Sequence, residues 1–147
     1  MSLRDACNKM SKSDISKYSR ILLTDSNDEI STKISKAKSD SLKMPTSSDE
    51  LSDRPEINNL ITIYSSISNI DKDSVINLFS DKEISFFKSE LKDLVITLVE
   101  PIARNINEFK SDISYLKTTL NDGAMQATER ARKTIDEVNK LMGFSID

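Results

Sequence analysis

The sequence predicts an all-α protein: a bundle of about five or six helices preceded by a lysine-containing loop. Apolar residues recur every three or four positions over most of the chain, which is typical of amphipathic helices. Only two glycines and three prolines occur, too few turn residues for an all-β sandwich. A length of 147 residues is enough for one domain with its own core.

The first predicted helix covers roughly residues 27–39. Asp25 and Ser26 precede it, and Ser26 with Glu29 three residues later forms a capping box. The stretch 39–54, rich in serine and aspartate, is predicted to be a loop.

Two further helices are predicted to begin at Pro55 and just after Asp71. Proline suits the first helical turn, and aspartate is a common N-cap. Arg54 immediately precedes Pro55. We expect Arg54 to be structural, pairing with a carboxylate or donating to backbone carbonyls.

The longest apolar periodicity runs from Phe87 to Phe109 and contains Pro101. Proline removes a backbone donor and clashes with the preceding turn, so we expect a kink near Val99 or two abutting helices. Residues 113–120 predict one more short helix. Asn121, Asp122 and Gly123 are expected to end it.

A last helix is then predicted from Asp122, as N-cap, to Met142. Gly143 suits a left-handed C-cap, and Phe144 is expected to close that cap hydrophobically. Met125 and Phe144 are expected to be core residues. The inward face of this helix is predicted to consist of Ala124, Ala127, Ala131, Ile135, Val138 and Leu141.

Composition limits the possible chemistry. The chain has no histidine and only Cys7, which argues against zinc sites and Cys–His nucleophiles, and no metal ligands are predicted. No apolar run approaches the ~20 residues of a membrane helix, and residues 1–20 lack the apolar region of a signal peptide. The net charge of −3 does not by itself indicate nucleic-acid binding.

The pentapeptide Lys9–Ser13, followed by Asp14, is the most informative stretch. It reads Lys-Met-Ser-Lys-Ser and contains no glycine, so it differs from a P-loop, which binds phosphate through backbone amides. Lysine ammonium groups reach anionic oxygens without demanding a planar geometry, and serine adds hydroxyl donors. The alternative is an ordinary solvated loop with two lysines.

This pentapeptide is identical to the signature of class I aminoacyl-tRNA synthetases. Beyond it, the chain resembles the C-terminal half of a bacterial-type tryptophanyl-tRNA synthetase, in its alphaproteobacterial or mitochondrial branch. The resemblance spans nearly the whole chain in the family's order. Four segments carry the resemblance. The first is the pentapeptide with Ser2–Asp5 before it, and the second is residues 24–26 with 36–40. The third is residues 53–56 with 59–60 and 63–64, and the fourth is residues 122–124 with 134, 137–138 and 141–144.

The resemblance implies a division into residues 1–24, a catalytic-domain remnant with the lysine loop, and residues 25–147, a helical domain that binds the tRNA anticodon. It implies ATP-dependent activation of tryptophan and its transfer to tRNA(Trp). Lys12 is expected to contact the ATP phosphates with the larger effect and Lys9 to assist, while Met10, Ser11 and Ser13 complete the loop. Candidate tRNA contacts, each as easily explained as a solvated helix face, are Arg104, Arg130, Arg132 and Lys133.

Further expectations follow from the same resemblance. Mg²⁺ would arrive with the nucleotide, the intact family protein would be a homodimer, and the protein would work in a bacterial cytoplasm or, alternatively, a mitochondrial matrix, without membrane contact. The family's N-terminal half, with its histidine-containing adenine motif and tryptophan pocket, is expected to be missing here, so that the fragment alone is inactive. Met1 would then be an internal methionine. Two alternatives remain, a catalytically dead tRNA-binding remnant and a non-enzymatic helical interaction module.

Overall fold

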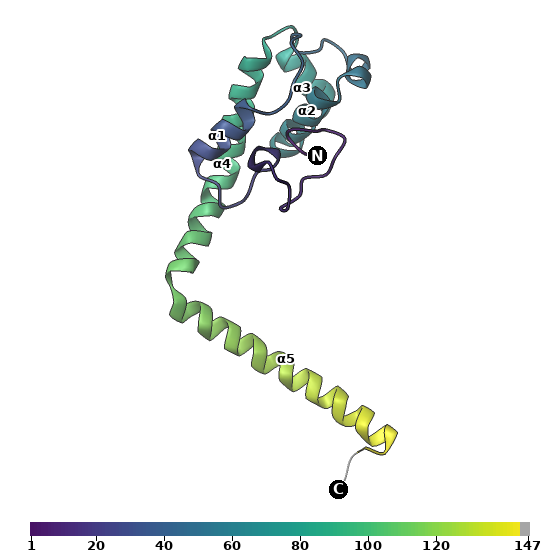
Figure 1. Ribbon diagram of the computed structural model, residues 1–147, viewed down its shortest axis with the longest axis vertical. Helices are drawn as coiled ribbons and strands as arrows, with labels where there is room; N and C mark the ends of the chain where they lie inside the picture. Colours follow the sequence, from purple (N-terminus) through teal and green to yellow (C-terminus); the bar gives the residue numbers. More distant parts are fainter. Residues whose placement is uncertain (145–147) are drawn as a thin grey trace. The chain divides into compact units, whose positions relative to one another are not determined.

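A computed structural model describes residues 1–144, and these residues form helices and loops without a β-strand (Figure 1). The all-α prediction is therefore confirmed. Two short 3₁₀ helices and five α-helices follow one another in the order η1 (Lys17–Ser19), α1 (Asn27–Ser35), η2 (Ser48–Asp53), α2 (Pro55–Ser68), α3 (Lys72–Phe79), α4 (Ile84–Ser111) and α5 (Ile113–Met142). The chain divides into two compact units, Met1–Arg104 and a second that begins at Asn105.

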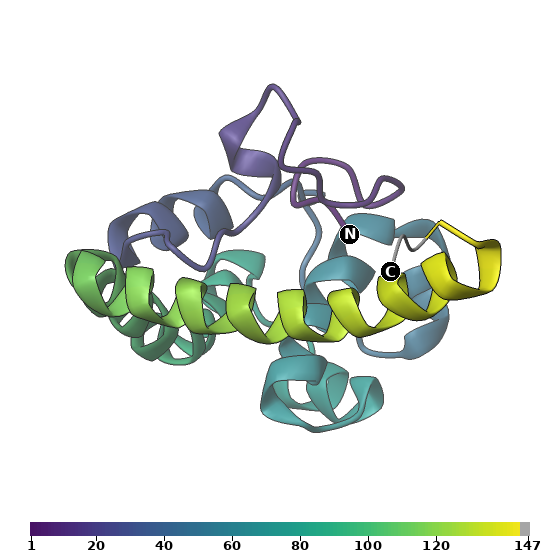
Figure 2. The ribbon, with the colours of Figure 1, turned by 90° about the horizontal axis from the view of Figure 1, so that it is seen from below.

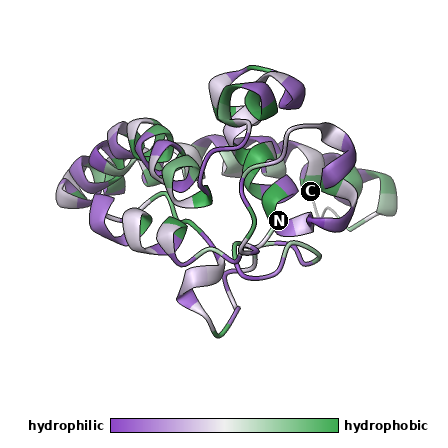
Figure 3. Ribbon diagram, turned by 90° about the horizontal axis from the view of Figure 1, so that it is seen from above, coloured by the Kyte–Doolittle hydropathy of each residue, from purple (hydrophilic) through white to green (hydrophobic). Residues whose placement is uncertain are grey.

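The first unit has a core formed by α1, α2, α3 and the first half of α4. Tyr64, Phe79 and Phe87 meet at its centre, with ring centroids 5.0–5.8 Å apart, a separation at which aromatic rings attract one another. The fully buried aliphatic residues around this core include Ile30, Ile34, Ile57, Leu60, Ile61, Val75, Ile76 and Leu91. Hydrophobic and hydrophilic residues alternate along the helices, as Figure 3 shows.

Three predicted helix starts are confirmed. Ser26 and Glu29 form the reciprocal capping box of α1, Pro55 lies at the first position of α2, and Asp71 accepts the Ser74 N–H at the start of α3. Helix α1 ends at Ser35, earlier than the expected residue 39, because the backbone N–H groups of Lys36 and Ala37 close its last turn.

Helix α4 runs as one helix through Pro101, so the alternative of two abutting helices is wrong. Its residues Phe87, Leu91, Val95 and Val99 repeat every four positions and are buried. The predicted apolar face extends further than this buried part, because Leu98 and Phe109 are about half exposed.

The predicted break at residues 121–123 is wrong, because α5 continues through it without interruption. A glycine inside a helix costs about 1 kcal/mol, which the strong helix formers that follow it, Ala124, Met125, Gln126 and Ala127, outweigh. The N-cap of α5 is Asp112, not Asp122: its carboxylate accepts the Tyr115 N–H at 2.8 Å. Gly143 has the predicted left-handed backbone (φ 72°). Its N–H and that of Phe144 close the helix on the carbonyls of Lys140 and Asn139.

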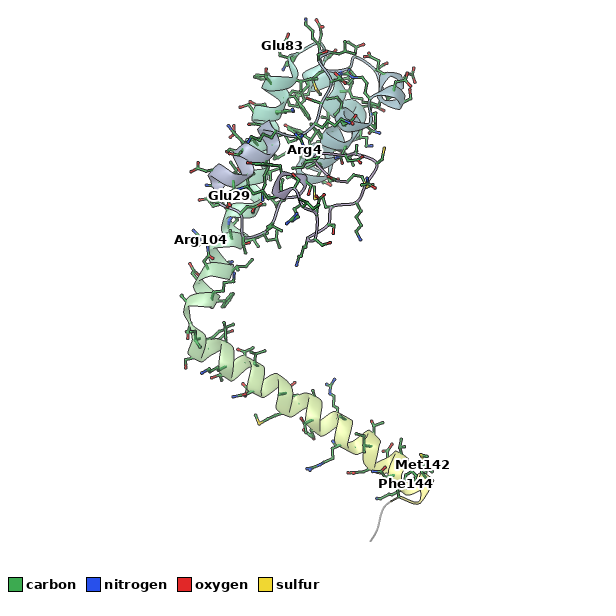
Figure 4. The ribbon with its side chains drawn as sticks, in the orientation of Figure 1. Arg4, Glu29, Glu83, Arg104, Met142 and Phe144 are labelled. Atoms are coloured by element: carbon green, nitrogen blue, oxygen red, sulfur yellow. The ribbon has the colours of Figure 1, made fainter. Side chains whose placement is uncertain are left out.

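Helix α5 buries none of its residues, although its hydrophobic periodicity is strong. The expected inward face and the expected core positions Met125 and Phe144 are all exposed. Figure 4 shows side chains standing out along the whole helix, with Met142 and Phe144 labelled at its end. Periodicity identifies an apolar stripe, but a stripe is buried only where another element covers it.

Candidate phosphate-binding loop

The N-terminal stretch that carries the lysine loop is held against the helices of the first unit. The Leu3 side chain is buried in the core, its N–H donates to the Ser19 carbonyl at 2.9 Å, and its carbonyl accepts the Lys38 N–H at 2.7 Å. The amide of Asn59 on α2 donates to the Ser2 carbonyl at 3.0 Å. The loop therefore begins from a fixed backbone position. Figure 2 shows this purple stretch outside the helices.

Within the loop, one side chain points inward and two point outward. Met10 is partly buried and packs against the core, whereas Lys9 and Lys12 are exposed. Neither ammonium group takes part in an ion pair within residues 1–144. Anchoring at Met10 leaves both ammonium groups exposed to solvent.

The two serines of the pentapeptide shape a turn. Their hydroxyl oxygens are 2.9 Å apart, the Ser13 N–H donates to the Ser11 hydroxyl at 3.3 Å, and the Asp14 N–H donates to the Ser11 carbonyl at 3.3 Å. The Asp14 carboxylate in turn accepts the Ser16 N–H at 2.8 Å. These local bonds are typical of serine and aspartate in turns, and they place Lys12 at the tip of the loop.

Arg20 is a component of this site that the sequence reasoning missed. Its Nη1 donates to the backbone carbonyls of Asp14 at 3.1 Å and of Ser16 at 3.3 Å. Arg20 and Lys12 line one depression of about 460 Å³ together with residues 21–24. A depression of this size, with two cations on its wall, can accept a phosphate group or a chain of them.

A second cationic cluster lies around Tyr18, beside the start of α1. The Lys36 ammonium lies 4.3 Å from the centroid of the Tyr18 ring and donates to its hydroxyl at 3.3 Å. This hydrogen bond, followed by the charges of Lys36 and Lys17, lowers the pKa of the Tyr18 phenol. This contact cannot be predicted from the sequence, since residues 18 and 36 are distant in the chain.

Another depression, of about 560 Å³, lies between α4 and the segment after α1. Lys88 on α4 donates there to the Ala37 carbonyl at 2.7 Å and to the Ser39 hydroxyl at 2.9 Å. Burial lowers the pKa of this lysine, with a smaller contribution from the charge of Arg4. Two acidic residues, Asp40 and Glu83, also line the depression, so its charge is balanced.

Arg54 has the structural role predicted for it. Its Nε and Nη2 donate to the two carboxylate oxygens of Asp40 at 2.8 and 2.9 Å, and Nη2 also donates to the Lys43 carbonyl at 2.7 Å. The guanidinium lowers the pKa of the Asp40 carboxyl chiefly through this hydrogen bonding. This bidentate pair ties the segment after α1 to the start of α2.

The four candidate tRNA contacts are exposed and lie on two helices. Arg104 lies on α4 (Figure 4), and the other three lie on α5. Arg130 and Lys133 are three residues apart and share a face, whereas Arg132, two residues from Arg130, points to another side of the helix. The Lys133 ammonium pairs with Glu129 at 3.1 Å.

Within residues 1–144 the structure holds no group of three or more metal-ligating side chains. None of the helices in that part of the chain combines the length and the apolar character that a membrane-spanning helix needs.

Comparison with known proteins identifies the family. The family model described as tRNA synthetases class I (W and Y) matches residues 1–141. Since this match covers nearly the whole chain, from the lysine loop to the last turn of α5, the chain belongs to that family. The resemblance predicted from the sequence is confirmed.

Within this family, the individual relatives that the chain resembles are tryptophan–tRNA ligases. The chain is 44% identical over 146 residues to the tryptophan–tRNA ligase of Rickettsia felis, which covers 99% of this chain and 44% of the relative. It is 41% identical over 144 residues to that of Rhizobium meliloti, covering 98% of this chain and 41% of the relative. The chain thus spans less than half the length of these relatives.

A solved structure gives the same picture. The crystal structure of tryptophanyl-tRNA synthetase from Mycoplasma pneumoniae superposes with a TM-score of 0.68 at 26% sequence identity. The superposition covers 97% of this chain and 44% of the other. The helical arrangement described above is therefore also found in a solved synthetase.

Proposed function

We propose that this chain is part of a tryptophan–tRNA ligase, which activates tryptophan with ATP and transfers it to tRNA(Trp). Membership of the class I family supports the reaction class. The choice of tryptophan is supported by the relatives, which are tryptophan–tRNA ligases at 40–44% identity. The observation that carries the proposal in the structure is the outward placement of Lys9 and Lys12 on a loop anchored at Met10.

The lysine loop would act on the first step of the reaction. When the tryptophan carboxylate attacks the α-phosphate of ATP, negative charge builds on the departing pyrophosphate. A cation that meets this charge stabilises the transition state more than the ground state. We assign Lys12 the main contact because it lies at the tip of the loop, beside the depression that it shares with Arg20. Lys9 assists, and Ser11 and Ser13 hold the turn and donate hydrogen bonds.

Loss of one preorganised donor at a developing charge typically costs about 3 kcal/mol of barrier, or roughly a hundredfold in rate. ATP is a substrate in this proposal, and Mg²⁺ would be carried by the nucleotide. The residues of this chain supply positive charge and hydrogen bonds and take no part in proton transfer.

The helices would have a separate role in binding tRNA(Trp). Single-stranded loops of RNA are recognised through splayed bases, hydrogen bonds and stacking, and exposed arginines on helices can supply such contacts. Arg130 and Lys133 are the stronger pair, because they share one face of α5, and Arg104 and Arg132 are separate candidates. A homodimer, the 1–24 and 25–147 division, and a bacterial cytoplasmic or mitochondrial location belong to the same proposal.

The decisive experiment uses a polypeptide that contains this chain joined to the remainder of a ligase. Tryptophan-dependent exchange of pyrophosphate into ATP should be present, and Lys12→Ala should lower its rate by roughly a hundredfold. Lys43→Ala is the matched control, because Lys43 is an exposed lysine whose ammonium pairs with Asp81, away from the loop. If Lys12→Ala and Lys43→Ala behave alike, the role assigned to Lys12 is wrong.

The isolated chain should show no exchange activity, since this proposal places the tryptophan pocket in the part of the relatives that the chain does not match. Measurable turnover by residues 1–147 would contradict that. Binding of tRNA(Trp) to the isolated chain should weaken as salt is raised, because phosphate contacts release counterions. A chain that does not bind tRNA(Trp) at any salt concentration would instead be an interaction module. Family membership does not favour this alternative.

A further inference from the structure

We propose that Arg20 is a positioning residue for the lysine loop, holding the backbone after Ser13 so that Lys12 faces the phosphates. The inference rests on the proposed phosphate-binding role of the loop and adds a residue to it. Arg20 lies outside the pentapeptide, and its role follows from contacts that only the folded chain makes.

The Arg20 side chain is bonded to the backbone on one side of its guanidinium and, within residues 1–144, is unpaired on the other. Its Nη1 donates to the carbonyls of Asp14 and Ser16, the residues that follow the pentapeptide. Its Nε is buried without a hydrogen-bond partner among the described residues. Leaving a buried donor unpaired costs free energy. The backbone contacts of Nη1 and the packing of the side chain must offset this cost, because they hold the guanidinium where Nε is out of reach of water.

The second observation connects Arg20 to Lys12. Asp14 is bonded on both sides: its carbonyl accepts from Arg20, and its N–H donates to the Ser11 carbonyl. The turn closed by that second bond contains Lys12 and Ser13. Arg20 therefore fixes the residue that closes the turn, and a change at Arg20 is transmitted to the direction of the Lys12 side chain.

The third observation is the shared depression. Lys12 and Arg20 line the same hollow of about 460 Å³. Guanidinium remains charged at any ordinary pH, so an anion in this hollow experiences the positive potential of Arg20 as well as that of Lys12. A positioning effect and a direct charge effect predict different results for combined substitutions of Lys12 and Arg20, so experiment separates them.

The test uses the 147-residue chain and inorganic tripolyphosphate, with binding followed by NMR shifts in the loop. The variants are Arg20→Met, Arg20→Lys, Lys12→Ala and the double variant. Arg4→Met is the control, because Arg4 also donates through Nη1 to a backbone carbonyl, that of Lys36 at 2.6 Å. Circular dichroism verifies folding, and Arg20→Lys serves as the milder change if Arg20→Met unfolds.

We expect Arg20→Met to weaken tripolyphosphate binding roughly fivefold, which corresponds to a coupling of about 1 kcal/mol between contacting residues. Arg20→Lys should retain most of the wild-type affinity. In the Lys12→Ala background, Arg20→Met should change the affinity less than about twofold. Arg4→Met should bind as the wild type does. Faster cleavage by trypsin after Lys12 should accompany Arg20→Met, because the turn loses its support.

Three results would overturn the inference, and they differ from failure of the proposed function. An equal loss in both backgrounds would mean that Arg20 acts by charge alone. Faster cleavage after Lys12 with unchanged affinity would mean that Arg20 is merely structural. If Lys12→Ala lowers the affinity for tripolyphosphate but Arg20→Met leaves it unchanged, the loop binds phosphate and Arg20 has no part in that binding. Wild-type chain whose loop shows no shift with tripolyphosphate would contradict the phosphate role itself, and Arg20 would then have nothing to position.

Discussion

The Lys33 ammonium and the Asp25 carboxylate form an ion pair at 2.5 Å in which both side chains are almost fully buried. Asp25 also accepts the Leu22 N–H at 2.8 Å, so one carboxylate joins the segment before α1 to the body of that helix. Breaking a buried pair leaves an uncompensated charge inside the protein, which typically costs about 3–5 kcal/mol.

Lys33→Met should therefore lower the free energy of unfolding by about 3–5 kcal/mol, measured by urea denaturation. Lys133→Met is the matched control. Lys133 pairs with Glu129, but both side chains are more than 70% exposed, and such surface pairs contribute less than about 1 kcal/mol. Similar losses in the two variants would show that burial of the Asp25–Lys33 pair is not what matters.

The Arg54–Asp40 pair predicts a pH-dependent stability. Arg54 holds the pKa of Asp40 below its ordinary value of 3.8, so the unfolded state takes up a proton first as the pH falls. The pair's contribution is fully present above the unfolded pKa and is lost as the pH falls through the lower folded pKa.

Arg54→Met should cost about 2 kcal/mol near neutral pH, since the hydrogen bonds involve charged groups. Urea denaturation from about pH 7 to about pH 2.5 should show the difference between wild type and variant shrinking below about pH 4. A difference that stays constant over this range would mean that Arg54 stabilises the fold through packing and its contact with the Lys43 carbonyl instead.

The Tyr18–Lys36 contact makes a spectroscopic prediction. Because hydrogen bonding from Lys36 lowers the pKa of the Tyr18 phenol, Lys36→Met should raise that pKa toward its ordinary value of 10.0. The chain has three tyrosines, so the alkaline absorbance change is measured for each protein and for its Tyr18→Phe derivative, and the difference isolates Tyr18. An unchanged titration in Lys36→Met would show that the contact is not maintained in solution.

How much of the fold is predictable depends on whether a feature is local. Ser26 with Glu29, Pro55, Asp71 and Gly143 act within one helical turn, and each was predicted correctly. The break expected at residues 121–123 failed for a related reason. Weak helix breakers there compete with favourable residues over many positions, and a sum over the whole helix decides the outcome.

The site divides in the same way. The pentapeptide is contiguous, so it was visible in the sequence together with its two lysines. The contact from Arg20 that supports the loop was not predictable from the sequence. Arg20 donates to the backbone carbonyls of Asp14 and Ser16, and every residue has such a carbonyl, so the residue types give no sign of the contact. An arginine six residues after a turn is too common to single out.

The exposed stripe of α5 provides the last prediction, a contrast between two isoleucines. Ile61 on α2 is fully buried, whereas Ile135 on α5 is 56% exposed. Ile61→Ala removes a packed side chain and should cost about 2–5 kcal/mol. Ile135→Ala should change stability by less than about 0.5 kcal/mol, because little packing is lost and alanine favours helix. Urea unfolding is followed by far-ultraviolet circular dichroism, which reports the helices of both units. A loss of several kcal/mol in Ile135→Ala would mean that the stripe is covered in solution by another part of the chain or by a second copy.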